Sequence, residues 1–238
     1  MRGCLFTLLL GAAVIALIVV VGLPQVAAGM VTTAVTTAGL RADDTTVTVS
    51  SDPPTDLVGL HADRVRIRAS DALFRGLAIG NLDIRLGDVA LLSRTIGEVD
   101  GTLKDVTVDN LGGREVTLDE IAIGGKSGDI TASTVIPGAQ AERLIADAIE
   151  ERTGVRPTDV TLSSPDRLEA DIGVIVGGSL DVTVDGDVVL AVDDNPLGVE
   201  SVTLVDGGGD LPIRITDVRV TRDGDLRLDG DLSIGLLG

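Results

Sequence analysis

Residues 61–90 read HADRVRIRASDALFRGLAIGNLDIRLGDVA, and this stretch decides the fold class. Apolar and polar side chains alternate from Arg64 to Ala69 and again from Leu82 to Leu86. Alternation with a period of two is typical of a β-strand that buries one face. The two runs therefore predict two half-buried strands.

The same alternation recurs along most of the chain after Thr45, at 116–118, 168–176, 180–184 and 226–234. Dipeptides that tolerate positive φ lie between or beside several of the runs, and such pairs close antiparallel hairpins. We expect hairpin turns at Gly177-Gly178, Asp185-Gly186 and Asp223-Gly224.

The phase of the alternation changes at two places. It changes near Thr216 and Asp217, and again between Leu103 and Val106. A change of phase within a strand indicates a β-bulge, and bulges bend sheets. We therefore predict a highly curved antiparallel β-meander.

One segment, from Pro137 to Thr153, has the period of a helix instead. Its apolar residues gather on one side and its charged residues on the other, which is typical of an amphipathic α-helix. Pro137 suits the first turn and Gly154 the end of such a helix. The predicted fold class is α+β, with the meander wrapped around this one long helix.

The N-terminus carries no charged side chain from Gly3 to Leu40, and Gly3 to Leu23 is almost wholly aliphatic. At about 1.5 Å per residue, the aliphatic run spans roughly the 30 Å of a bilayer core. Two interpretations stay open. The segment is an uncleaved transmembrane signal-anchor, or a signal peptide removed after Val26-Ala27-Ala28 to leave Gly29 as the mature N-terminus.

We divide the chain into a transmembrane or signal-anchor segment at 1–24, a linker with helical character at 25–44, and a β-rich domain at 45–238. The expected location is the cell membrane, with a single pass and the domain on the extracytoplasmic side. If the N-terminus is cleaved, the protein is secreted or periplasmic.

Composition excludes several classes of partner. The residues after Leu40 carry all 37 acidic side chains against 18 Arg and Lys, so nucleic acid is an improbable partner. The chain has no Trp or Tyr, and Phe74 is the only aromatic residue after the apolar segment. Sugars and single-stranded nucleic acids stack on aromatic rings. The remaining apolar residues are aliphatic, and they suit an aliphatic interior or an aliphatic ligand.

Motifs of catalysis are also missing. His61 is the only histidine and no Gly-x-Ser-x-Gly elbow accompanies it, which argues against a Ser-His nucleophile. Gly207-Gly208-Gly209 lacks the Lys-Ser/Thr of a P-loop. The Asp-Gly-Asp sequences at 185–187, 223–225 and 229–231 lack the EF-hand register and indicate turns. We predict no enzyme activity, no cofactor and no metal site.

Three segments carry a family resemblance. The closing LPIRITDVRVTRDGDLRLDG at 211–230, IRLGDV at 84–89 and GTLKDV at 101–106 resemble the LmeA-like phospholipid-binding family of bacterial cell-envelope proteins, over roughly 57–232. The resemblance implies a fold related to tubular lipid-binding domains. It also implies non-enzymatic binding or transfer of a phospholipid or related glycolipid.

A curved aliphatic sheet closed by an aliphatic helix face would form a groove for acyl chains, each buried methylene contributing about 0.8 kcal/mol. A headgroup phosphate would suit the arginine forks of the strand at 64–68. The alternatives are a filled core, a solvated arginine face, and an envelope scaffold or protein-interaction β module without a lipid. The expected acyl-chain contacts are Phe74, Ala141, Leu144, Ile145, Ala148 and Ile149, and the expected headgroup contacts are Arg64, Arg66 and Arg68.

Overall fold

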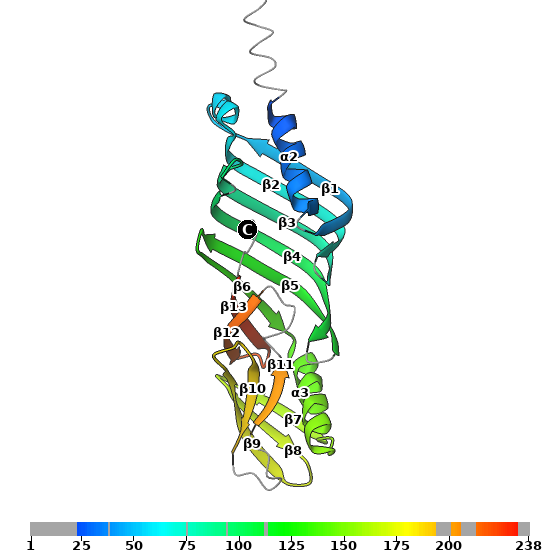
Figure 1. The fold of residues 1–238 in the computed structure, drawn as a ribbon. Coiled ribbons are helices and arrows are strands. Elements are labelled where there is room, and N and C mark those ends of the chain that lie inside the picture. The colour runs from blue at the N-terminus through cyan, green and yellow to red at the C-terminus, as the bar shows by residue number, and fades with distance from the viewer. Residues whose placement is uncertain are drawn as a thin grey trace, which may run out of the picture.

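The computed structural model describes residues 23–37, 39–74, 76–93, 95–111, 114–193, 201–205 and 213–232. In these residues the chain forms mostly antiparallel β-structure, in two sheets with two α-helices. The molecule is elongated, with the larger sheet and α2 (Leu23–Thr37) toward one end and the smaller sheet with α3 (Gly138–Thr153) at the other (Figure 1).

The large sheet has eight strands in the order β1-β2-β3-β4-β5-β6-β13-β12. The first six form the meander that the alternation predicts, because each strand follows its neighbour in sequence. The bounds are β1 (Leu40–Ser50), β2 (His61–Phe74), β3 (Leu77–Ala90), β4 (Thr95–Leu111), β5 (Arg114–Lys126), β6 (Asp129–Ile136), β12 (Ile213–Val220) and β13 (Leu226–Leu232), with a 3-10 helix η2 (Pro54–Gly59) between β1 and β2.

The small sheet has five strands in the order β11-β10-β9-β8-β7. Its strands are short, and α3 packs against the two edge strands. The bounds are β7 (Asp159–Ser163), β8 (Arg167–Asp171), β9 (Ile175–Val182), β10 (Val188–Val192) and β11 (Ser201–Val205).

The expectation of a single meander around one helix therefore describes only part of the structure, which has two sheets and two α-helices in the described residues. The chain leaves the large sheet after β6, builds α3 and the small sheet, and returns so that β13 pairs with β6, from Leu226 opposite Ile136 to Asp231 opposite Thr131. Local alternation predicts strands but does not encode which distant strand each one joins. The second helix, α2, lies partly within the expected linker 25–44 and packs on β1 through Ala27 and Val31.

Aspartates with positive φ bend the large sheet. Asp71, Asp88 and Asp105 have φ of 48, 50 and 52°. A single left-handed residue reverses the alternation, so the buried side chains of β4 change phase from Leu103 to Val106. This confirms the phase change between these two residues.

The structure tests the other expected irregularities. The β12–β13 ladder shifts register between Ile215 and Asp217, as predicted. Turns follow at Gly186 and Gly224, whose φ values are 91 and 86°. The expected turn at Gly177-Gly178 is wrong, because both glycines lie inside β9. A Cβ on residue 178 would come within 2.7 Å of the Ala191 carbonyl oxygen, so a close approach of two strands, and no turn, requires this glycine.

The amphipathic helix is confirmed, with Pro137 preceding its first residue and Gly154 (φ 73°) ending it. The N–H of Gly154 donates to the Glu150 carbonyl at 2.7 Å. At the other end, the Gly138 N–H donates to Asp225 Oδ1 at 2.9 Å. Because Asp225 precedes β13, this bond ties the start of α3 to the β12–β13 turn.

The core is aliphatic and continuous. One cluster of buried side chains extends from Ala27 in α2 through the large sheet to Ile149 in α3 and Val202 in β11. Among the described residues, no buried side chain is polar or charged. Among the same residues, Ser51 Oγ is the one buried side-chain polar atom without a hydrogen-bond partner.

Candidate functional site

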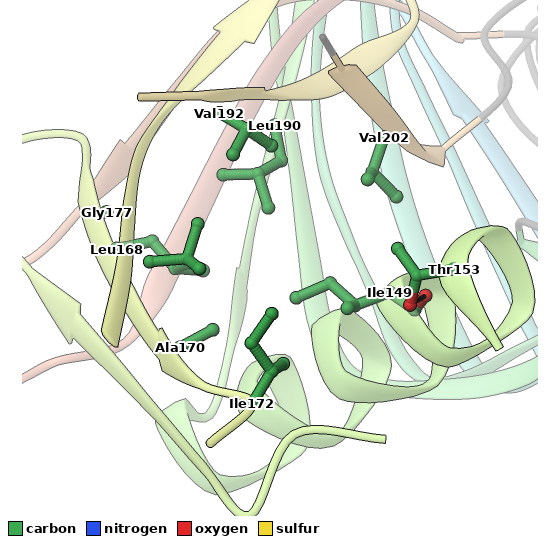
Figure 2. Close-up of a pocket in the computed structure, with 10 residues that line it drawn as sticks. Ile149, Thr153, Leu168, Ala170, Ile172, Gly177, Leu190, Val192 and Val202 are labelled. Atoms are coloured by element: carbon green, nitrogen blue, oxygen red, sulfur yellow. Dashed lines mark hydrogen bonds between the residues drawn. The ribbon is translucent and has the colours of Figure 1, made fainter. Parts of the chain in front are cut away.

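A cavity lies between the last turn of α3 and the inner face of the small sheet (Figure 2). Its volume is about 30 Å³, measured to the centres of water-sized spheres. A cavity needs roughly 10–15 Å³ on this measure to hold one water, so the space would take about two. The lining consists of Ile149, Thr153, Leu168, Ala170, Ile172, Val176, Gly177, Leu190, Val192 and Val202.

The alternation of the small sheet explains this lining. Leu168 and Ala170 face inward from β8, and Leu190 and Val192 line the cavity from β10. Side chains two residues apart share one face of a strand. The strand alternation at 168–176 thus contained a signal for four of the ten lining residues, although the sequence alone did not show that α3 would cover this face.

Thr153 is the one hydroxyl side chain among the described lining residues, and its oxygen already has partners. Thr153 Oγ1 donates to the Ile149 carbonyl at 2.7 Å and accepts the Val155 N–H at 3.1 Å. A hydroxyl with both roles used by the backbone behaves as an apolar surface toward the cavity. The site therefore suits a purely apolar group.

Ala170 is the lining residue through which the cavity can be filled. Its side chain points into the cavity from β8 (Figure 2), and it is 4% exposed. Gly177 lines the cavity only with its backbone, because it pairs with Glu169, whose exposed side chain lies on the outer face of the small sheet. A larger residue at 177 would therefore point away from the cavity, whereas a larger residue at 170 would point into it.

The expected helix face is divided between cavity and core. Ile149 lines the cavity, as Figure 2 shows. Ala141, Ile145 and Ala148 are 0, 1 and 4% exposed and belong to the continuous core, while Leu144 is half-buried against it. The expected helix face therefore meets the cavity only at the last turn of α3, because only this turn lies over the cavity of the small sheet.

Phe74 lies elsewhere. It ends β2, opposite Leu77 of β3 and Leu40 of β1, and is partly buried against the core of the large sheet. The cavity belongs to the other sheet. The structure therefore does not bring Phe74 together with Ile149.

The arginines of β2 line the outward face of the large sheet. Arg66 Nε donates to Asp83 Oδ1 at 2.8 Å, and Arg68 Nε lies 3.6 Å from Asp83 Oδ2. The hydrogen bond from Arg66 lowers the pKa of the Asp83 carboxyl below its ordinary value. Arg64 is exposed and forms no ion pair within the described residues. Two of the three arginines are thus paired with an acid, away from the cavity.

In the described part of the chain, one group of side chains has atoms that could hold a metal ion: His61, Asp63 and Asp88, with their ligand atoms within 4.8 Å of one another. Asp63 accepts the Asp52 N–H at 2.6 Å, which lowers its pKa. The left-handed backbone of Asp88 recurs at Asp105, where no such group forms among the described residues. The hydrogen bond of Asp63 and the backbone of Asp88 thus each have a structural explanation.

No helix in the described part of the chain is long and apolar enough to cross a membrane. The expected anchor at 1–24 falls almost wholly on residues 1–22, which lie outside the described residues. Comparisons of the chain with protein-family models, with curated proteins and with solved structures found no match.

Proposed function

We propose that this protein binds an acyl chain of a phospholipid or related lipid in the cavity between α3 and the small sheet, without catalysis. The observation that carries the proposal is a cavity lined by aliphatic side chains and one satisfied hydroxyl, in a core where no buried residue among those described is polar or charged. Apolar cavities of this kind stay dry and accept apolar guests.

Size determines what enters. The space for about two waters accepts the end of an acyl chain, each buried methylene contributing about 0.8 kcal/mol. A longer length of chain enters if the last turn of α3 separates from the sheet. Ile149 and Thr153 would then move away from Leu168 and Leu190, and methylenes of the lipid would pack between them. In this proposal, the small sheet and α3 bind the lipid between them, and α3 is a cover that opens to admit it.

The proposed setting is the outer side of the cytoplasmic membrane, with the apolar N-terminal segment as a single-pass anchor. The supporting observation is the uncharged stretch from Gly3 to Leu40. A curved meander of the tubular lipid-binding type would then carry the cavity on the extracytoplasmic side. Transfer and storage of the lipid are both compatible with this arrangement.

The test fills the cavity. Ala170→Leu places a larger side chain in the cavity, while Gly177→Leu, whose side chain would lie on the outer face of the same sheet with no atom within 4 Å of its Cβ position, is the matched control. Purified full-length protein is titrated with cis-parinaric acid, a fatty acid with intrinsic fluorescence. We expect Ala170→Leu to weaken binding at least tenfold and Gly177→Leu to leave it unchanged, with unfolding midpoints that show both variants to be folded.

Native mass spectrometry of protein extracted from its membrane supplies the second readout. A co-purified lipid that is present in the unsubstituted protein and absent from Ala170→Leu supports the proposal. A protein that carries no lipid and does not bind parinaric acid would overturn it.

The alternative is a protein-interaction β module, which one observation favours. β1 and β12 form the two edges of the large sheet. β12 packs against β9, and its Val220 N–H donates to the Pro165 carbonyl at 2.6 Å, so β1 is the open edge, hydrogen-bonded to one strand among those described. An exposed edge can accept a strand from a partner. Failure of both lipid assays would leave this alternative as the better interpretation.

A further inference from the structure

Three segments meet at the end of the domain where α2 begins. The start of α2 and the 3-10 helix η2 lie together at one end of the elongated molecule (Figure 1). The turn between β3 and β4 joins them, because the Leu91 N–H donates to the Leu60 carbonyl at 2.8 Å. We call the surface formed by these three segments the N-terminal end.

The N-terminal end exposes apolar side chains from all three segments. In η2, Leu57 is 1% exposed and Val58 is 65% exposed. The helix therefore packs on the core through Leu57 and leaves the side chain of Val58 on the surface. Leu92 in the β3–β4 turn is 76% exposed, and Val26 and Met30 in α2 are 56 and 48% exposed. Gathered at one end, they form a surface that an apolar partner would cover.

The outer face of α2 is unusual for a helix in contact with water. No charged residue occurs from Leu23 to Thr37. The hydroxyls of four threonines donate to the carbonyl four residues earlier, and such bonds satisfy hydroxyl groups without water. The bonds run from Thr32 to Ala28, Thr33 to Gly29, Thr36 to Thr32 and Thr37 to Thr33, at 2.9, 2.9, 2.9 and 2.7 Å.

We infer that the N-terminal end rests in the interfacial layer of the lipid bilayer, with Val26, Met30 and Val58 among the acyl chains. This inference depends on the proposed membrane anchor. The occupant follows from where that segment ends: the uncharged residues 3–22 directly precede α2, so a bilayer entered by them lies next to Val26. Interfacial side chains penetrate roughly 5–10 Å.

The local charges indicate which lipid surface is involved. Asp52, Asp56 and Asp63 lie in or beside η2 and outnumber the neighbouring base, Arg64, and acidic groups are repelled by anionic headgroups. Apolar insertion therefore has to supply the contact. We expect it to be at least as strong on zwitterionic vesicles as on vesicles that contain anionic lipid.

Docking at this end would hold the cavity away from the anchoring membrane. α2 packs on β1, and seven strand spacings of about 4.8 Å put the β12 edge roughly 34 Å farther along the sheet. The small sheet and α3 lie toward that far end (Figure 1). A bound acyl chain would then be received from, or delivered to, a carrier or a second lipid surface.

The absence of tryptophan and tyrosine from the chain permits a direct experiment. Single-tryptophan variants Val58→Trp and Val26→Trp report on the N-terminal end. Ile175→Trp, at a side chain 76% exposed beside the cavity, is the matched control at the other end. The full-length variants are reconstituted in phosphatidylcholine vesicles with and without brominated acyl chains, and unfolding midpoints verify that each folds.

Flotation of the vesicles tests the anchor, and tryptophan emission tests the docking. In floating protein, we expect blue-shifted emission that brominated lipid quenches for Val58→Trp and Val26→Trp, and unquenched emission for Ile175→Trp. Emission that brominated lipid does not quench at either N-terminal site overturns the docking, while the anchor stands. A blue shift without quenching also overturns the docking and would indicate a protein partner. Protein that does not float overturns the anchor itself.

Discussion

Asp105 of β4 and Gly80 of β3 lie opposite each other, and a Cβ on residue 80 would come within 2.9 Å of the Asp105 Cβ. The left-handed backbone of Asp105 brings its side chain over the neighbouring strand. Asp71 of β2, also left-handed, lies opposite Gly80 on its other side. One glycine thus makes room for the bend that crosses three strands.

Gly80→Ala should therefore destabilise the protein. The added methyl group meets a Cβ in the middle of a sheet, where neither strand can withdraw, and overpacking of this kind costs about 1–3 kcal/mol. Urea denaturation measures the free energy of unfolding. Gly124→Ala, which meets no atom within 4 Å, is the control, and an equal loss in both variants would refute the explanation.

The sequence predicted elements better than it predicted their assembly. The alternation in β2 and β3, the helix ended by Gly154 and the register shift beside Asp217 all follow from local patterns, and the structure contains them. Gly178 was misassigned because a glycine required for close approach of two strands looks like a glycine required for a turn. The division into two sheets depends on long-range pairing of β13 with β6, which leaves no local trace.

Asp225→Ala should loosen the start of α3. Its carboxylate accepts the Gly138 N–H, one of the helical donors that have no partner within the helix. Loss of a side-chain cap costs about 0.5–2 kcal/mol. Asp223→Ala, at an exposed residue of the same turn, removes the same charge without removing the bond, and it should unfold at the wild-type urea concentration.

Asp229 should make stability depend on pH on the acid side. The hydrogen bonds from Arg227 and then from Arg219 lower the pKa of this carboxyl below its ordinary 3.8. Because the folded pKa is the lower one, the stabilisation is complete above about pH 3.8 and is lost as the pH falls through the folded value.

Asp229→Asn should therefore be less stable than the unsubstituted protein at pH 7, with the difference shrinking below pH 3.8. Thermal unfolding across the pH range measures the difference. Asp231→Asn changes the net charge equally at an exposed position without an ion pair among the described residues. If Asp231→Asn shows the same pH dependence, net charge and not the arginine contacts would be responsible.

In the candidate site too, local sequence patterns predicted the elements but not the contacts between them. Ile149 was identified because it lies on the apolar side of a clear helix, but the helix pattern did not reveal that Ala141 and Ile145 face the core while Ile149 faces a cavity. That difference arises at the last turn of α3, where packing against the small sheet leaves a cavity within the continuous core.

Ile172→Ala should have the opposite effect from filling the cavity through Ala170. Ile172 lines the cavity just after β8 and is only half-buried, so its truncation widens the space at a modest loss of stability. If the acyl chain enters here, the variant should bind cis-parinaric acid faster and at least as tightly, as stopped-flow fluorescence would measure. Ile175→Ala removes the same atoms from an exposed side chain outside the lining and should leave the association rate unchanged. Equal association rates in all three proteins would show that the chain enters elsewhere, even if Ala170→Leu blocks binding.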